Sequence, residues 1–297
     1  MALGIPLESV VRDYWLTTCL HGVANSETGG IAQRGDTGEM LARYAFAGGT
    51  SLVSAWGITE RYSEDLDLLA LGSEHLSGSA VQRVLSLPSK WATAAIGASD
   101  DDVVNKHMGD MGFRRTLFAL GGQAEFLKME TTVETNDERI WDVSTASSLM
   151  GRFASDEQRS TYPELGGFEM PCIVPGYTAA NKFDALHRRA VTRDFRGLTV
   201  RGRDLYDLAQ IAQSDHAEAA SGMVPEMAER ASLSPGRRDD VPRPRGGYAN
   251  SPAFDPRTEA GRALEAGYEQ TVEELVWGQA PPFGEAAELA QRLDDTS

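Results

Sequence analysis

Apolar and polar residues follow two different periods along the chain, and the change comes near residue 176. Before it, runs with a period of two indicate β-strands, because successive side chains of a strand point to opposite faces. Such strands are expected up to residue 46 and over residues 65–71, 113–120, 123–133, 139–143 and 167–174. Helical spacing predicts helices over residues 6–24, 51–56 and 77–97, with a kink or break at Pro88 in the last. The polar or acidic segments 25–38, 57–64 and 99–110 are expected to be loops.

After residue 176 the helical period dominates. Helices are expected over residues 178–191, 203–214, 258–277 and 285–293, and a long, basic, proline-rich loop over residues 234–257. The pattern therefore predicts an α+β protein. Its first domain, residues 1–176, holds a mixed sheet with flanking helices, and residues 177–297 form a mostly helical C-terminal domain.

Composition narrows the class of protein. A chain of 297 residues with 41% hydrophobic residues has ample material for a core. Its two cysteines are too few for a disulfide framework, and none of its five histidines stands at a zinc-ligand spacing from a cysteine or another histidine. The net charge of -16 argues against a general nucleic-acid coating protein or a membrane-surface binder, since both need a basic footprint.

The N-terminal residues indicate a cytoplasmic protein. Glu8, Arg12 and Asp13 stand where a signal peptide needs an apolar core, and no window approaches 18 consecutive apolar residues. We therefore expect a cytoplasmic location and no membrane partner.

A glycine-rich turn follows the strand that ends at residue 46. Gly48 and Gly49 predict a turn that Thr50 or Ser51 closes as the N-cap of a short helix. Such a turn leaves backbone N–H groups available to cradle phosphate oxygens. By itself a Gly-Gly pair is more commonly a simple turn.

An acidic strand follows the turn. Asp65 and Asp67 lie on one face of it because they are two residues apart. Two neighbouring carboxylates repel, so a neutralising partner is expected, and Mg2+ is the partner that also suits a nucleoside triphosphate. Glu130, on a neighbouring strand, is a candidate third carboxylate for this face. The bland alternative is solvated acidic surface, but a turn, a helix and an acidic strand in this order favour a nucleotide site.

Two residues of the helical half complete the candidate site. Lys182 lies on the helix that follows the last strand, and its compact cation suits a triphosphate. Asp204 opens the next helix and either orients Lys182 or accepts a proton from an attacking hydroxyl. The alternatives are a solvated helix cation and, for Asp204 and Asp207, acidic residues favoured by the helix dipole.

The segment from Lys182 to Arg203 is the one strongly basic part of the sequence around the candidate site. It holds seven basic and two acidic residues, a local balance of +5. A polyanion such as RNA is expected to dock there, unless these cations pair with the protein's own acidic groups. The arginines concerned are Arg188, Arg189, Arg193, Arg196, Arg201 and Arg203.

Four short motifs resemble the AbiEii family, the nucleotidyltransferase toxins of bacterial toxin–antitoxin pairs that include the mycobacterial MenT toxins. They are the segments 48–52 (GGTSL), 61–68 (RYSEDLDL), 181–186 (NKFDAL) and 201–208 (RGRDLYDL). The resemblance spans roughly residues 5–275 and implies an α/β-type nucleotidyltransferase fold. It also implies that Lys182 contacts nucleotide phosphates, that Asp204 lies at the active site, and that a cognate antitoxin is a partner.

The predicted reaction is in-line displacement at the α-phosphorus of a nucleoside triphosphate, with release of pyrophosphate. Mg2+ would be held by Asp65, Asp67 and Glu130, and the outgoing phosphates by Gly49, Thr50, Ser51 and Lys182. The family resemblance points to the 3' end of tRNA, or another RNA, as acceptor and to a block of translation. Two alternatives stay open: transfer to a protein or small molecule, and a catalytically silent nucleotide-binding protein.

Ser63 is a candidate regulatory phosphosite. It stands two residues before Asp65, and a phosphate there would bring about two negative charges to the site. Some MenT toxins are controlled by phosphorylation, which the resemblance extends to this position. A serine that caps the loop is the alternative.

Overall fold

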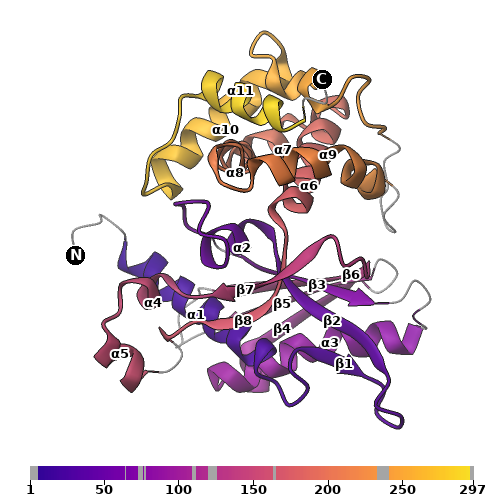
Figure 1. Cartoon of the computed structure of the whole chain (residues 1–297), viewed down its shortest axis with the longest axis vertical. Helices are drawn as coiled ribbons and strands as arrows, with labels where there is room; N and C mark the ends of the chain where they lie inside the picture. Colours follow the sequence, from indigo (N-terminus) through magenta and orange to yellow (C-terminus); the bar gives the residue numbers. More distant parts are fainter. Residues whose placement is uncertain are drawn as a thin grey trace. The chain divides into compact units, whose positions relative to one another are not determined.

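The computed structural model describes residues 6–63, 65–72, 76, 78–108, 112–119, 126–162, 165–232 and 241–294 (Figure 1). The chain divides into two compact units. The first comprises residues 1–56 and 62–173, and the second comprises residues 57–61 and 174–297. Within the described ranges, no helix is both long and apolar enough to cross a membrane.

A mixed sheet forms the centre of the first unit. Its strands are β1 (Ile31–Gln33), β2 (Met40–Ala47), β3 (Asp65–Gly72), β4 (Val103–Met108), β5 (Phe113–Ala119), β6 (Phe126–Thr135), β7 (Trp141–Ala146) and β8 (Phe168–Ile173). They lie in the order β4-β5-β6-β3-β2-β8-β7, with β1 added beside β2. The pairs β3/β6 and β2/β8 are parallel, and the other pairs are antiparallel. The predicted mixed sheet is confirmed.

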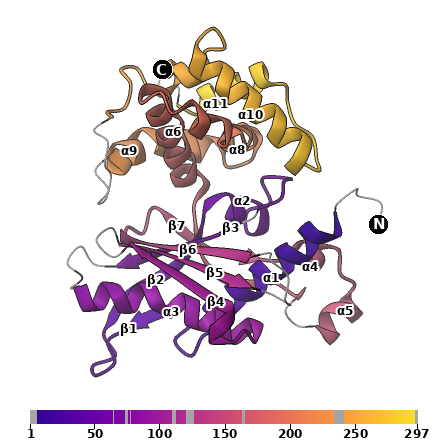
Figure 2. The same ribbon diagram turned by 180° about the vertical axis from the view of Figure 1, so that it is seen from behind.

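Helices α1 (Leu7–Ala24) and α3 (Gly78–Ile96) lie on the same side of this sheet, as the two opposite views show (Figures 1 and 2). Apolar residues of both helices join the core with the buried positions of the strands. The Tyr44 hydroxyl of β2 donates a hydrogen bond to the Val84 carbonyl oxygen of α3 at 2.6 Å. Because one face is covered in this way, the alternating strands keep their polar residues for the other face.

Strand β3 shows this alternation most clearly. Leu66, Leu68 and Ala70 are buried in the core, whereas Asp65 and Asp67 are only partly buried. The strand lies between β2 and β6 in the middle of the sheet. Its two aspartates therefore project from the face opposite α1 and α3, as their spacing predicted.

Some predicted boundaries are wrong. Residues 103–108, expected to be loop, form β4 at the edge of the sheet, a place that tolerates polar residues. Helix α3 continues through the buried Pro88, so the helix is not broken there, and a kink at this residue stays a prediction. The short helices α4 (Leu149–Phe153) and α5 (Asp156–Thr161) were not predicted. The expected hairpin turn at Gly121–Gly122 lies outside the described residues.

The second unit is helical, as predicted. It contains α6 (Pro175–Val191), α7 (Phe195–Thr199), α8 (Gly202–Gln213), α9 (Ala217–Ser232), α10 (Glu259–Leu275) and α11 (Phe283–Leu293). Helix α6 packs against α9, and α8 packs against α10 and α11. Aromatic rings fill the space beside α6: Phe183 stacks on Tyr248 with centroids 5.4 Å apart. Helices α7 and α9 were not expected from the sequence.

Residues 57–61 belong to the second unit although the first unit surrounds them in sequence. The Trp277 N–H donates to the Glu60 carbonyl oxygen at 3.0 Å, and the Glu60 N–H donates to the Tyr206 hydroxyl at 3.3 Å. Arg61 also forms an isolated antiparallel bridge with Val276. We call this segment the strap. It is part of the connection between helix α2 (Gly48–Ser54) and β3, and the contacts named above are all with residues of the second unit.

Candidate active site

The predicted phosphate turn begins at Gly48, which has a φ of +72° and is also the first residue of helix α2. A Cβ atom built at Gly48 would stand only 2.1 Å from Oδ2 of Asp67. The Asp67 carboxylate therefore lies directly against the turn. Only glycine satisfies both requirements, the left-handed backbone and the close approach.

The prediction that Thr50 or Ser51 caps this helix is wrong. The N-cap is Ala47, and its side chain makes no capping hydrogen bond. Ser51 Oγ donates to the Gly48 carbonyl oxygen at 2.8 Å, and Thr50 Oγ1 donates to the Asp65 carbonyl oxygen. Both side chains are buried. These hydroxyls donate hydrogen bonds within the turn and to β3. The backbone of the turn is therefore the part that is suited to binding a phosphate.

The register of β3 and β6 places the predicted carboxylates together. In this parallel pair Asp65 lies beside Lys128, and Asp67 lies beside Glu130. Neighbouring residues in register project from the same face, so all four side chains share the face opposite α1 and α3. The placement of Glu130, which rested on an assumed pairing, agrees with the expectation.

Cations already neutralise part of this face. Lys128 Nζ lies 2.6 Å from Asp65 Oδ2 and 3.5 Å from Glu130 Oε1. Arg115 of β5 binds the same Glu130 oxygen through Nε at 2.8 Å and a terminal nitrogen at 2.7 Å. The repulsion between carboxylates, from which a metal ion was inferred, is thus relieved in part by protein side chains.

The donor set fits one Mg2+ ion with few protein ligands. In the described part of the chain, no group of three or more His, Cys, Asp or Glu side chains converges on a single metal position. Two aspartates on one face beside a phosphate turn suit a cation that is bound by one or two carboxylates and by substrate phosphates. Glu130 as a metal ligand stays a prediction.

Ser63 lies before the start of β3, and its hydroxyl contacts Thr50 Oγ1. The side chain is partly buried. Through Thr50 it connects to the main chain of Asp65. A modification at Ser63 would therefore act on the fastening between the turn and the acidic strand.

Within the second unit, Lys182 is held by two aspartates of helix α8. Its Nζ lies 2.7 Å from Asp204 Oδ1 and 2.7 Å from Asp207 Oδ2. Arg201 adds a bond to Asp204 at 2.9 Å. Lys182, Asp204 and Asp207 are all buried. The alternative of a solvated helix cation is thereby wrong for Lys182, while its contact with nucleotide phosphates stays a prediction.

Arg61 is the member of this network that sequence reasoning missed. Its Nε and a terminal nitrogen bind the two oxygens of Asp207 at 2.6 and 2.7 Å, and both side chains are fully buried. The local signal was its place as the first residue of the motif 61–68, four residues before Asp65. Its partner lies 146 residues away, so no local pattern could have identified the pairing with Asp207.

The charges in this network shift one another's pKa values. Burial acts to raise the pKa of Asp204, but the cations Lys182 and Arg201 outweigh it and hold this pKa well below its usual range. For Asp207, burial is likewise outweighed by Arg61 and Lys182, so its pKa is lowered. Burial acts to lower the pKa of Arg61, and Asp207 more than compensates. The lowered pKa values keep both carboxyl groups ionised at neutral pH. The network joins these two acidic side chains to three basic ones, Arg61, Lys182 and Arg201.

The arginines predicted to dock RNA differ in their exposure and in their contacts. Arg189 pairs with Asp194, and Arg201 pairs with Asp204, so the expected alternative of internal pairing holds for these two. Arg193 and Arg196 are exposed, and Arg188 and Arg203 are partly buried. Arg193 follows the end of α6 with a φ of 59°, a backbone conformation that usually selects glycine.

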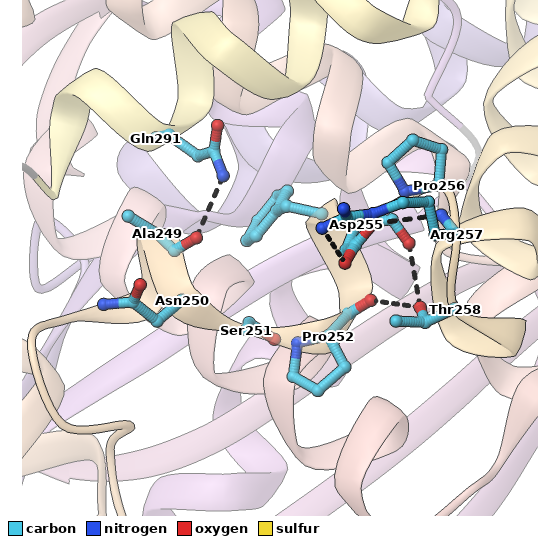
Figure 3. A pocket seen from close by; sticks show the side chains of 10 residues that line it. Ala249, Asn250, Ser251, Pro252, Asp255, Pro256, Arg257, Thr258 and Gln291 are labelled. Atoms are coloured by element: carbon cyan, nitrogen blue, oxygen red, sulfur yellow. Dashed lines mark hydrogen bonds and ion pairs between the residues drawn. The ribbon is translucent and has the colours of Figure 1, made fainter.

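Two cavities are formed by other residues. One, of about 610 Å³, lies in the second unit between residues 249–258 and Gln291 (Figure 3). Its polar groups bond to one another: Arg257 pairs with Asp255 at 2.9 Å, and Gln291 donates to the Ala249 carbonyl oxygen at 2.9 Å. A second cavity, of about 310 Å³, is lined by residues 27–38 and by α3. None of the predicted site residues is among those that line these two cavities.

The predicted phosphate turn and the acidic strand form the combination that is expected of a nucleotidyltransferase. The family model for the nucleotidyl transferase AbiEii toxin of type IV toxin–antitoxin systems matches residues 37–288. The chain belongs to this family of toxin nucleotidyltransferases, and an antitoxin partner is part of that assignment.

The solved structures that are similar to the chain include two from Helicobacter pylori. JHP933 from Helicobacter pylori is 13% identical with a TM-score of 0.44, and the match covers 98% of this chain and 95% of that one. A second H. pylori protein, described provisionally as a nucleotidyltransferase, is 13% identical with a TM-score of 0.40, and 99% of each chain is covered. No curated protein matches the sequence significantly.

Proposed function

We propose that this protein is a Mg2+-dependent toxin that transfers a nucleotide from a nucleoside triphosphate to the 3' end of an RNA, with tRNA as the first candidate. The contact between Gly48 and Asp67 carries the proposal, because it brings a phosphate turn and a carboxylate to the same place. A triphosphate at the turn would meet the acidic face directly.

Asp65 and Asp67 would hold the Mg2+ ion, which when bound neutralises charge on the phosphates. The backbone N–H groups at Gly48 and Gly49 would orient the outgoing phosphates. In the reaction, an oxygen of the acceptor hydroxyl forms a bond to the α-phosphorus while the bond to the leaving pyrophosphate breaks. A carboxylate of the acidic face would take the hydroxyl proton.

Lys182 would supply a positive charge to the triphosphate. Its ammonium is held by Asp204 and Asp207, and Arg61 and Arg201 compensate these two aspartates. The network therefore combines a fixed position with a net positive charge, which favours an anionic ligand. In this role Asp204 would orient Lys182.

An RNA acceptor is favoured by the exposed arginines that follow α6. Arg193 retains a long charged side chain at a backbone conformation that costs a non-glycine residue roughly 1 kcal/mol. Because the Arg193 side chain is exposed, this cost suggests that the residue serves binding rather than the stability of the fold.

The test is incubation of the protein with each labelled nucleoside triphosphate, total RNA and Mg2+, followed by separation of RNA, protein and small molecules. Asp67→Asn serves as the inactive control, because it removes a charged ligand with little change of shape. Label in RNA that is absent with Asp67→Asn supports the proposal. Label in protein or in small molecules would show that the acceptor is not RNA. No transfer at all would indicate a catalytically silent binding protein.

Phosphorylation of Ser63 is proposed as a means of control. A phosphate there would disturb the Thr50 contact and add about two negative charges beside Asp65. Ser63→Glu is expected to lower activity and triphosphate affinity, whereas Ser63→Ala should retain both. Full activity of Ser63→Glu would contradict this regulation without touching the assignment as a nucleotidyltransferase.

A further inference from the structure

Lys128 stands among the carboxylates that are proposed to bind metal. It projects from β6 beside Asp65 of β3, with its Nζ 2.6 Å from Oδ2, and it also lies 3.5 Å from Glu130. Its side chain is 28% exposed and that of Asp65 is 18% exposed. The pair is therefore screened less than an ion pair on open surface.

Arg115 completes a row of alternating charge across three adjacent strands. Arg115 of β5 lies opposite Glu130 of β6, and both of its bonds go to the Glu130 oxygen that faces Lys128. The row runs from Arg115 through Glu130 and Lys128 to Asp65. Asp67 continues this face toward the phosphate turn, where it lies against Gly48.

This row determines where a divalent cation has room. A second ion between Asp65 and Glu130 would need the position that the Lys128 ammonium holds, and two cations at that distance repel strongly. Glu130 is in turn paired with two cations, Arg115 and Lys128. Asp67, which lies against Gly48, is the carboxylate on the side of the phosphate turn, and Asp65 shares its face of β3.

We propose that Lys128 is a built-in cation that restricts the acidic face to a single divalent ion, held by Asp65 and Asp67, and that Glu130 positions Lys128 rather than binding metal. This inference rests on the proposed function, since it assumes that the aspartates bind a cation. It makes Lys128 a residue that sets the number of metal ions and not a general surface charge.

Titration with Mn2+, followed by electron paramagnetic resonance, tests the inference without measuring activity. Wild type is expected to bind one ion per chain, with and without a non-hydrolysable triphosphate analogue. Lys128→Met should bind a second ion, or the first one on the order of tenfold more tightly, because the competing charge is gone. Lys90→Met, an exposed lysine of α3, changes the net charge equally and should match wild type.

Lys128→Gln provides the same test if the methionine variant does not fold, since an amide keeps a hydrogen bond to Asp65 without the charge. Equal stoichiometry and affinity in wild type, the Lys128 variant and Lys90→Met would overturn the inference, as would two ions in wild type. If Asp67→Asn binds Mn2+ as wild type does, the proposed metal site itself fails. The two failures are therefore distinguishable.

Discussion

At the scale of single residues, Gly48 is the position where an added side chain would displace a carboxylate of the acidic face, that of Asp67. Gly48→Ala places a methyl group against the Asp67 carboxylate and imposes a positive φ on a residue with a side chain. The backbone conformation alone costs about 1–2 kcal/mol. We expect transfer activity to fall about as far as in Asp67→Asn, with a lower melting temperature.

Gly38→Ala is the matched control for this prediction. Gly38 has a φ of +68°, but nothing lies within 4 Å of a Cβ built there. It should lose stability through the same backbone cost and keep its activity. Equal loss of activity in both variants would show that strain, and not the contact with Asp67, matters.

Asp13 is a buried carboxylate that is expected to make the free energy of unfolding depend on pH. Burial raises its pKa from 3.8 to about 6, although the Leu149 N–H, which donates to Oδ2 at 2.6 Å, and Arg152 act in the other direction. The folded state therefore holds the proton more tightly than the unfolded state. The contribution of Asp13 to stability is fully present below pH 3.8 and is lost as the pH rises through about 6.

Asp13→Asn is expected to remove this loss. An amide oxygen still accepts from Leu149 but carries no charge to bury. At pH 7 the free energy of unfolding should rise by on the order of 1–3 kcal/mol, and its slope between pH 4 and 6 should become flatter. Urea unfolding across this range measures both effects. The control is Asp36→Asn at an exposed position, and equal curves for the two variants would contradict the prediction.

At the scale of elements, the strap and helix α8 depend on one buried pair. Arg61→Met removes one of the two cations that hold the buried Asp207, and Asp207→Leu removes the carboxylate that pairs with the buried Arg61 guanidinium. Breaking such a pair from either side costs about 3–5 kcal/mol. We expect the double variant Arg61→Met/Asp207→Leu to lose less stability than the two single losses combined.

A double-mutant cycle by urea unfolding measures this coupling. The exposed pair Arg34–Glu39 is the comparison, and its cycle should give about 0.2–1 kcal/mol. Because the pKa values of Asp204 and Asp207 are lowered, the network's contribution is present above about pH 4 and is lost as the pH falls below it. Additive losses in the Arg61 cycle would mean that the pair is not coupled.

At the scale of the whole molecule, charge decides how RNA approaches. A chain with a net charge of -16 repels a polyanion, so docking must use a local basic surface. The double reversal Arg193→Glu/Arg196→Glu should weaken RNA binding and reduce its log–log salt slope by about one unit for each phosphate that the protein ceases to bind. Triphosphate binding should be unchanged.

The double reversal Arg257→Glu/Arg262→Glu changes the net charge equally at two exposed positions of the same unit. It should leave the slope of tRNA binding as in wild type. Parallel salt series in all three proteins would contradict docking at Arg193 and Arg196. Nucleotide transfer to another acceptor would remain compatible with that result.

The sequence by itself determined the features that local geometry dictates. The common face of Asp65 and Asp67 arises from the period of a strand, and the left-handed turn at Gly48 arises from the freedom of glycine. The mixed sheet followed by helices is encoded in the change of period near residue 176. Each of these properties depends on residues that are close in the chain.

Only the tertiary structure decided which distant residues meet. The register of β3 and β6 put Lys128 between Asp65 and Glu130, and folding of the second unit brought Arg61 to Asp207 across 146 residues. It also turned residues 103–108 into an edge strand, because β5 offered a partner. Long-range pairing depends on the packing of the whole chain, and the residues that meet carry no mark of their partners in the local pattern.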